Sequence, residues 1–178
     1  MKGRAEMALL PIIYAPDSRL KLKCQEVKKI DESVCRLMED MLETMYAAPG
    51  IGLSAPQVGD SRRMLVCDIA RQNEVPRPIK MVNPKVVWLS DETLVAEEGC
   101  LSLPQHFAEV QRPKEIRVKY LDEFGDNKEV AADGLLAACI QHEIDHLDGI
   151  LFVDYLSPLR RNIIVRKMKK LKRQKEAA

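Results

Sequence analysis

The residues best suited to chemistry lie in the segment His142-Glu143-Ile144-Asp145-His146. An α-helix has about 3.6 residues per turn, so side chains four positions apart lie on the same face. His142 and His146 can therefore bind one metal ion, and Glu143, on the neighbouring sector, can take a proton from water activated at that ion. The pattern predicts a hydrolytic metal site, but it is short and needs support from the rest of the chain.

The segment is predicted to lie on a mostly buried helix that runs from Gly134 to Leu147. Asp133 can cap the start of this helix, and Gly149 can end it. The helix carries a run of apolar side chains before the motif, which are Leu135, Leu136, Cys139 and Ile140. These side chains predict an apolar environment around the metal-binding residues.

A catalytic metal site of this kind usually has three protein ligands and one open position. A third His six residues after His146 would fall on Phe152, and the next Glu after the motif is Glu176, near the end of the chain. The third ligand is therefore expected upstream, where the candidates are Cys100 and His106. A thiolate is a strong ligand for a divalent cation, but a free cysteine is also often a small buried hydrophobe, so on residue chemistry alone both alternatives for Cys100 stay open.

Length and composition predict one domain over residues 1–178, in which residues 1–6 could be a disordered extension before Met7. Apolar residues make up 46% and charged residues 31% of the chain, and no apolar stretch approaches the roughly 20 residues of a membrane span. Five cysteines without a C-x-x-C pair are typical of reduced thiols. We therefore expect a cytoplasmic protein without a membrane partner, in which the cysteines other than Cys100 pack in the core.

The C-terminal segment 159–178 is predicted to be a basic helix, with helical periodicity over Leu159 to Lys172. It contains nine Lys and Arg residues and one acidic residue, whereas the rest of the chain is net acidic. A basic segment on an acidic body indicates a polyanionic partner, with a solvated helix face as the alternative.

The remaining pattern predicts an α+β fold, in which short antiparallel sheets surround the central metal-binding helix and a C-terminal helix follows. An amphipathic helix is expected over Val34 to Tyr46, and a Gly/Pro-rich loop over Gly50 to Gly59. Short strands are expected at Arg63–Ile69, Met81–Leu89, Thr93–Glu97, Phe107–Val110, Ile116–Leu121 and Lys128–Ala131.

Three segments together resemble the signature motifs of bacterial peptide deformylase of the Gram-negative type. They are Gly50–Gln57 (GIGLSAPQ), Glu98–Ser102 (EGCLS) and Gln141–His146 (QHEIDH). The similarity extends from about Met7 to the C-terminal helix. It implies an enzyme that removes the N-formyl group from the initiator methionine of newly made polypeptides and releases formate.

The resemblance also implies roles for individual residues. Cys100, His142 and His146 would bind the metal with water as the fourth ligand, which favours Cys100 over His106. The metal would be Fe²⁺, with Zn²⁺ or Ni²⁺ able to occupy the same site. The tetrahedral oxyanion would be stabilised by the side-chain amide of Gln57 and the backbone N–H of Leu101, while Glu143 would transfer the proton to the leaving amine.

For the substrate, N-formylmethionyl nascent peptides, the resemblance implies an apolar pocket beside the metal site. Its lining would be Ile51, Leu101, Leu135, Ala138, Cys139 and the ring of His142. The peptide backbone would add as a strand near Ile51, Gly52 and Gly99. The basic helix would dock on ribosomal RNA, and DNA is not an expected partner.

Two positions depart from the family pattern. Ser54 stands where Ala is usual, and we expect a core-facing hydroxyl bonded to the backbone with little effect. The stretch Gln105-His106-Phe107 lacks an Arg that some members have, so contacts beyond the first two substrate residues are open, and His106 is expected to be an exposed rim residue. The alternatives to a deformylase are an endopeptidase that uses the same metal helix, and a ribosome-binding protein with an inactive site.

Overall fold

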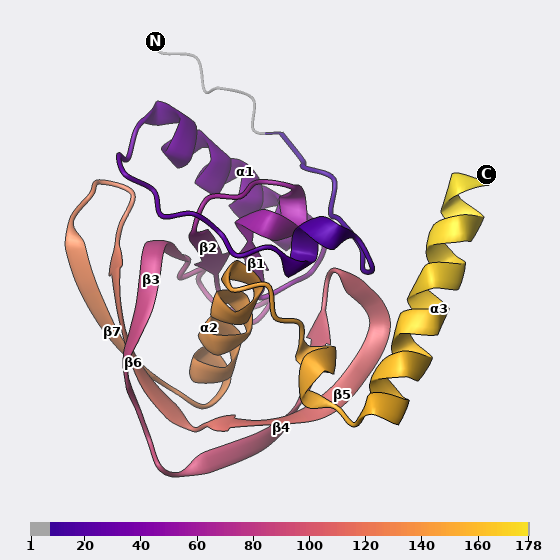
Figure 1. The fold of residues 1–178 in the computed structure, drawn as a ribbon. Helices are drawn as coiled ribbons and strands as arrows, with labels where there is room; N and C mark the ends of the chain where they lie inside the picture. Colours follow the sequence, from indigo (N-terminus) through magenta and orange to yellow (C-terminus); the bar gives the residue numbers. More distant parts are fainter. Residues whose placement is uncertain (1–7, 178) are drawn as a thin grey trace.

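The computed structural model describes residues 8–177, so the expected extension at 1–6 and the last residue of the basic segment lie outside it. Two antiparallel sheets surround a central helix, α2 (Gly134–Leu147), which carries the His-Glu-x-x-His segment (Figure 1). The predicted α+β class is therefore confirmed.

The larger sheet has five strands in the order β1-β2-β3-β6-β7, and the smaller pairs β4 with β5. The strands are β1 (Gly52–Ser54), β2 (Met64–Cys67), β3 (Ile79–Leu89), β4 (Thr93–Cys100), β5 (Leu103–Pro113), β6 (Glu115–Leu121) and β7 (Asn127–Asp133). Three 3-10 turns, η1 (Ser18–Lys21), η2 (Ala55–Val58) and η3 (Phe152–Tyr155), connect them to the helices. In this order β1 and β4 each keep one edge unpaired within their sheets.

The larger sheet lies between two helices, and the alternation of side chains along β2 shows why. Leu65 and Cys67 pack in one cluster with α2, whereas Met64 and Val66 pack in another with the methionine-rich face of α1 (Glu32–Ala47). Successive residues of a strand point to opposite faces, so a strand that is apolar throughout must be covered on both sides. This arrangement buries α2 and fixes the position of the face that carries His142 and His146.

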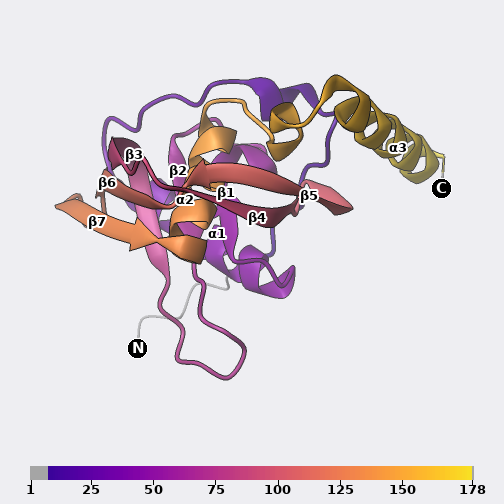
Figure 2. The same ribbon diagram turned by 90° about the horizontal axis from the view of Figure 1, so that it is seen from below.

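The C-terminal helix α3 (Pro158–Glu176) projects from the body of the molecule (Figures 1 and 2). Its one buried side chain among the described residues is Met168, which joins a third apolar cluster with Leu103 of β5 and Phe152 of η3. The predicted helix is present and slightly longer than expected. Most of its basic face is open to solvent.

Several elements differ from the sequence-based expectation. The segment Gly50–Gly59, predicted to be a loop, contains β1 and η2, because the edge of β2 offers a partner for three residues of strand. Strand β5 is much longer than the predicted Phe107–Val110, because it pairs with β4 along almost its whole length. Asp133 takes the N-cap position of α2, but its side chain makes no capping hydrogen bond.

Within residues 8–177, no helix has both the length and the apolar character needed to span a membrane.

Candidate active site

Cys100, His142 and His146 form a cluster in which the ligand-type atoms lie within 4.8 Å of one another. The two histidines project from successive turns of α2, and Cys100 is the last residue of β4. Nε2 of His146 lies 3.2 Å from the Sγ of Cys100 and 3.2 Å from Nε2 of His142. The structure thus brings together the predicted set of three, whose role as ligands stays a prediction.

The donor set fits a divalent cation. Metal bonds of about 2.0–2.3 Å to nitrogen and sulfur in a tetrahedral site place neighbouring ligand atoms roughly 3.3–3.7 Å apart. The two separations of 3.2 Å from Nε2 of His146 are close to this range. Burial holds the pKa of His146 well below its ordinary value, so its ring is neutral and offers a lone pair. Nδ1 of His142 lies 3.0 Å from the carboxylate of Glu98, which leaves Nε2 of this ring free to face the cluster.

His106, the other candidate for the third ligand, lies outside this cluster. It is half-buried on β5, and burial together with the charge of Lys167 on α3 lowers its pKa. It does not line the cavity described below. The expectation of an exposed rim histidine is therefore wrong, because the side chain is half-buried and lies outside the cavity wall.

A chain of hydrogen-bonded charged and polar groups begins at Nδ1 of His142. Both oxygens of Glu98 accept from the guanidinium of Arg112, which also donates to Asp145 at 2.8 Å. Tyr155 donates to the same Asp145 oxygen at 2.7 Å. Burial raises the pKa of Glu98, but hydrogen bonds from His142 and Arg112 outweigh it and lower the pKa to about 2.

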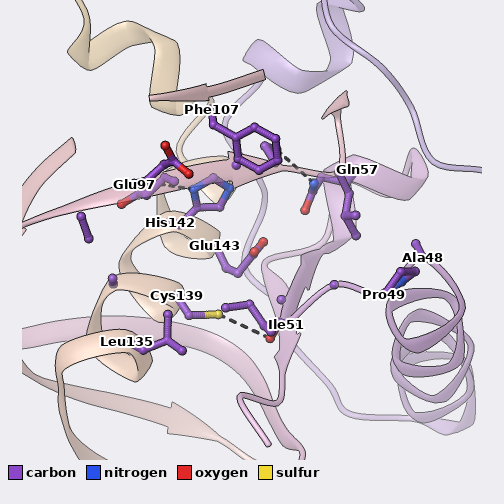
Figure 3. Close-up of a pocket in the computed structure, with 18 of the residues that line it drawn as sticks. Ala48, Pro49, Ile51, Gln57, Glu97, Phe107, Leu135, Cys139, His142 and Glu143 are labelled. Atoms are coloured by element: carbon purple, nitrogen blue, oxygen red, sulfur yellow. Dashed lines mark hydrogen bonds and ion pairs between the residues drawn. The ribbon is translucent and has the colours of Figure 1, made fainter. Parts of the chain in front are cut away.

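Glu143 follows His142 directly and points into the pocket (Figure 3). Its side chain is buried, and its Oε2 has no hydrogen-bond partner among the described residues. Burial raises the pKa of Glu143 to about 7, although His142 and the hydroxyl of Ser54 act in the opposite direction. A buried carboxylate with a free oxygen beside a metal-type cluster is suited to accept a proton.

Gln57 lies on η2, on the opposite side of the pocket from α2 (Figure 3). Its Oε1 accepts hydrogen bonds from both the backbone N–H and the hydroxyl of Ser54, each at 2.9 Å. Its Nε2 lies 3.2 Å from the hydroxyl of Ser102 and 3.6 Å from the Sγ of Cys100. The Ser54 hydroxyl thus faces the core as expected, and it donates to the side chain of Gln57.

A cavity of about 710 Å³ opens beside the cluster. Its walls include every residue expected to bind substrate: Ile51, Gly52, Gly99, Leu101, Leu135, Ala138 and Cys139. The thiol of Cys139 donates to the carbonyl of Ile51 at 3.4 Å and so joins α2 to the segment before β1 (Figure 3). Cys139 is thus both a core residue and part of the cavity wall.

Sequence reasoning did not identify Phe107 as a wall residue, although its side chain is 61% exposed at the mouth of the cavity. Phe107 pairs with Gly99 across the β4–β5 ladder, and its ring covers that glycine so closely that an added Cβ would lie 2.5 Å from Cε1. Leu94 and Tyr14 line the cavity as well. The sequence offered only a weak signal, an aromatic residue between His106 and Ala108 at the start of a predicted strand.

The fold and the site together define a metal-dependent hydrolase: a thiolate and two imidazoles can hold the ion, and a carboxylate and an amide face the same space. The family model of polypeptide deformylase matches residues 9–162, and the chain belongs to this family. It is therefore an enzyme that acts on formylated peptides.

Similar proteins agree with this assignment. The peptide deformylase of Bartonella henselae is 49% identical to the chain over 169 residues, which cover 95% of this chain and 96% of the relative. The peptide deformylase of Agrobacterium fabrum is 48% identical over 169 residues, which cover 95% of this chain and 99% of the relative. The crystal structure of peptide deformylase from Ehrlichia chaffeensis in complex with actinonin superimposes with a TM-score of 0.90 at 44% identity, covering 94% of this chain and 99% of that one. The crystal structure of a peptide deformylase from Legionella pneumophila superimposes with a TM-score of 0.88 at 45% identity, covering 96% of this chain and 99% of that one.

Proposed function

We propose that this protein hydrolyses the N-formyl group of the initiator methionine of newly made polypeptides and releases formate. The observation that carries the proposal is the convergence of three kinds of group at one end of one cavity. These are the Cys100, His142 and His146 cluster, the buried carboxylate of Glu143 and the side-chain amide of Gln57. Amide hydrolysis needs an activated water, a proton carrier and an oxyanion donor, and each of these groups is suited to supply one.

The proposed metal ligands are Cys100, His142 and His146. Thiolate and imidazole ligands suit iron, zinc and nickel alike, and we assign Fe²⁺ as the ion in the cell on the family resemblance, with Zn²⁺ or Ni²⁺ able to take its place. When bound, the cation supplies Lewis-acid activation of water and of the formyl carbonyl.

Glu143 is proposed to hold the proton of the attacking water and to deliver it to the departing amine. Its free Oε2 and its raised pKa support this role, because a proton carrier works best when its pKa lies near the working pH. The oxyanion is proposed to accept from Nε2 of Gln57 and from the backbone N–H of Leu101. Leu101 follows Cys100 in the tight turn between β4 and β5, and its side chain lines the cavity.

The substrate is proposed to lie between two strand edges. Gly99 belongs to β4 and Gly52 to β1, and each of these strands has one edge unpaired within its sheet. An extended peptide can bond to both edges through its main chain. The methionine side chain would enter the part of the cavity formed by Leu135, Ala138 and Cys139 of α2, beside Ile51 and Leu101.

The basic helix α3 is proposed to bind ribosomal RNA, which would bring the enzyme to nascent chains in the cytoplasm. Support comes from its nine Lys and Arg residues within 159–178 and from the single side chain that the helix buries. Binding of this kind rests on phosphate contacts and does not depend on base sequence.

The proposal is tested by measuring formate release from formyl-Met-Ala-Ser with protein loaded anaerobically with Fe²⁺. We expect activity that disappears on removal of the metal and falls by about 10²–10⁴-fold in Glu143→Ala. The matched control is Glu26→Ala, which removes an exposed carboxylate outside the cavity wall and should keep full activity. Actinonin should inhibit the loaded enzyme.

Inactive metal-loaded protein, or cleavage of the unformylated peptide Met-Ala-Ser at equal rate, would instead point to the endopeptidase or the inactive ribosome-binding alternative.

A further inference from the structure

Ser54 is a fully buried hydroxyl at the junction of β1 and η2, with 0% of its surface exposed, and the proposed mechanism gives it no role. A buried hydroxyl is unfavourable unless it is hydrogen-bonded. In this structure the partner is the side chain of Gln57, the proposed oxyanion donor, and the distance from Oγ to Oε1 is 2.9 Å. The hydroxyl therefore contacts the carboxamide that is proposed to face the reacting carbonyl.

The contact determines which way the carboxamide points. The Oε1 of Gln57 accepts from two donors of Ser54, its backbone N–H and its hydroxyl. A half-turn of the amide would place the NH₂ group against the backbone N–H of Ser54, which cannot accept, and the hydroxyl would have to rotate to accept instead. In the observed orientation Nε2 is directed toward Ser102 and Cys100 instead, at 3.2 and 3.6 Å.

We propose that Ser54 is a positioning residue for catalysis: its hydroxyl holds the Gln57 carboxamide with an N–H toward the formyl oxygen. The inference rests on the proposed function, since the orientation of Gln57 matters only if its amide donates to the reacting carbonyl. The backbone N–H of Ser54 already supplies one donor to Oε1, so the hydroxyl adds a second, smaller contribution.

The expected effect of Ser54→Ala follows from the loss of one neutral hydrogen bond. Such a bond contributes about a factor of 3 to 10. Because the oxyanion forms only in the transition state, kcat should fall by this factor while KM stays within about twofold.

A double-mutant cycle with Gln57→Ala separates positioning from a merely structural role. If Ser54 acts through Gln57, Ser54→Ala lowers kcat by about 3- to 10-fold when Gln57 is present and by less than twofold when position 57 is Ala. The inference is overturned if the factor is the same in both backgrounds, or if Ser54→Ala has no effect in the presence of Gln57.

Thr44→Val is the matched control, because it removes another buried hydroxyl, one that donates to the carbonyl of Asp40 within α1. This variant should melt at a lower temperature and keep the wild-type kcat. If the wild-type protein itself releases no formate, the proposed function has failed. If it is active and the cycle shows no coupling, only the role of Ser54 has failed.

Discussion

The carboxylate of Glu98 lies 3.0 Å from Nδ1 of His142, so a residue of the two-stranded sheet fixes the ring of a proposed metal ligand on the central helix. Arg112 holds the same carboxylate through two of its nitrogens and in turn contacts Asp145, three residues further along α2. Ion pairs and hydrogen bonds therefore connect the two-stranded sheet to α2 at the site, and the direction of the His142 lone pair depends on both elements.

Replacing Glu98 with Gln should weaken metal binding. The amide keeps the shape of the side chain but loses the charge that orients His142 and neutralises Arg112. Loss of such an outer contact lowers metal affinity by about 10- to 100-fold, and competition with a chelator measures it. The neighbouring Glu97→Gln is the control, since Glu97 is exposed and should leave the affinity unchanged. Equal affinity of both variants would show that Glu98 does not orient the ligand.

Gly52 has no room for a side chain. A Cβ at this position would lie 2.5 Å from Oε1 of Glu143 and 2.9 Å from the Sγ of Cys139. Gly52→Ala should therefore displace the proposed proton carrier and lower kcat by about 10- to 100-fold, a part of what general base catalysis contributes. Metal content, measured beside the rate, should stay at the wild-type level. A variant with wild-type kcat would mean that Glu143 can act from a shifted position.

Phe107 should influence substrate residues beyond the second. Its ring covers Gly99, where the peptide backbone is proposed to bind, and most of its surface is exposed. We expect Phe107→Ala to raise KM by about 3- to 10-fold for a formylated tetrapeptide with an apolar third residue, through the loss of aromatic surface contact. For formyl-Met-Ala the change should be smaller than twofold. The same change for both peptides would place the contribution of Phe107 at the methionine pocket instead.

Reversing charge on α3 should separate ribosome binding from catalysis. Arg166, Lys169 and Lys170 are exposed and lie far along the chain from the proposed site residues. Replacing all three with Glu should abolish co-sedimentation with ribosomes at low salt, because phosphate contacts carry binding of this kind. Turnover of formyl-Met-Ala-Ser should be unchanged.

The matched triple variant places Glu at three exposed lysines on the body of the protein, which are Lys23, Lys28 and Lys29. It should co-sediment like wild type. If both triple variants bind equally, α3 is a solvated face only.

Alkaline pH should destabilise the fold in part through Cys24. Burial raises the pKa of this thiol from 9.0 to about 11. Below pH 9 the thiol is neutral in both the folded and the unfolded chain, and its contribution to stability is fully present. Between pH 9 and 11 only the unfolded chain ionises, so the free energy of unfolding should fall by about 2 to 3 kcal/mol.

Denaturant unfolding under reducing conditions at pH 8, 9, 10 and 11 measures this loss. Cys24→Ala should be less stable at pH 8 because of the cavity it creates, yet its stability should fall less steeply with pH. Cys35→Ala, which removes a half-buried thiol elsewhere, should keep the wild-type slope. A wild-type slope in Cys24→Ala would contradict the prediction.

Helix α1 was predictable from sequence because it buries one face at helical spacing, which includes Met38, Met41 and Met45. Strand β1 was not predictable, since three residues that include Gly52 carry no periodic signal and form a strand only beside β2. Counting ligands placed the third member of the cluster upstream of the helix and left Cys100 and His106 as candidates, and the family resemblance then favoured Cys100.

What the sequence could not indicate are contacts set by register and tertiary packing. The ring of Phe107 covers Gly99 only because β4 and β5 pair in one register, with a bulge next to Cys100. Arg112 reaches Glu98 from fourteen residues along the chain. Local propensity carries no information about any of these pairings.

Unpaired strand edges usually expose a protein to aggregation, and proteins tend to shorten or cover them. Here two such edges, on β1 and β4, stand on either side of one cavity. A ligand held by its main chain is recognised by features that all polypeptides share. A single binding groove can thus serve an entire proteome, with discrimination concentrated in the first residue and its modification.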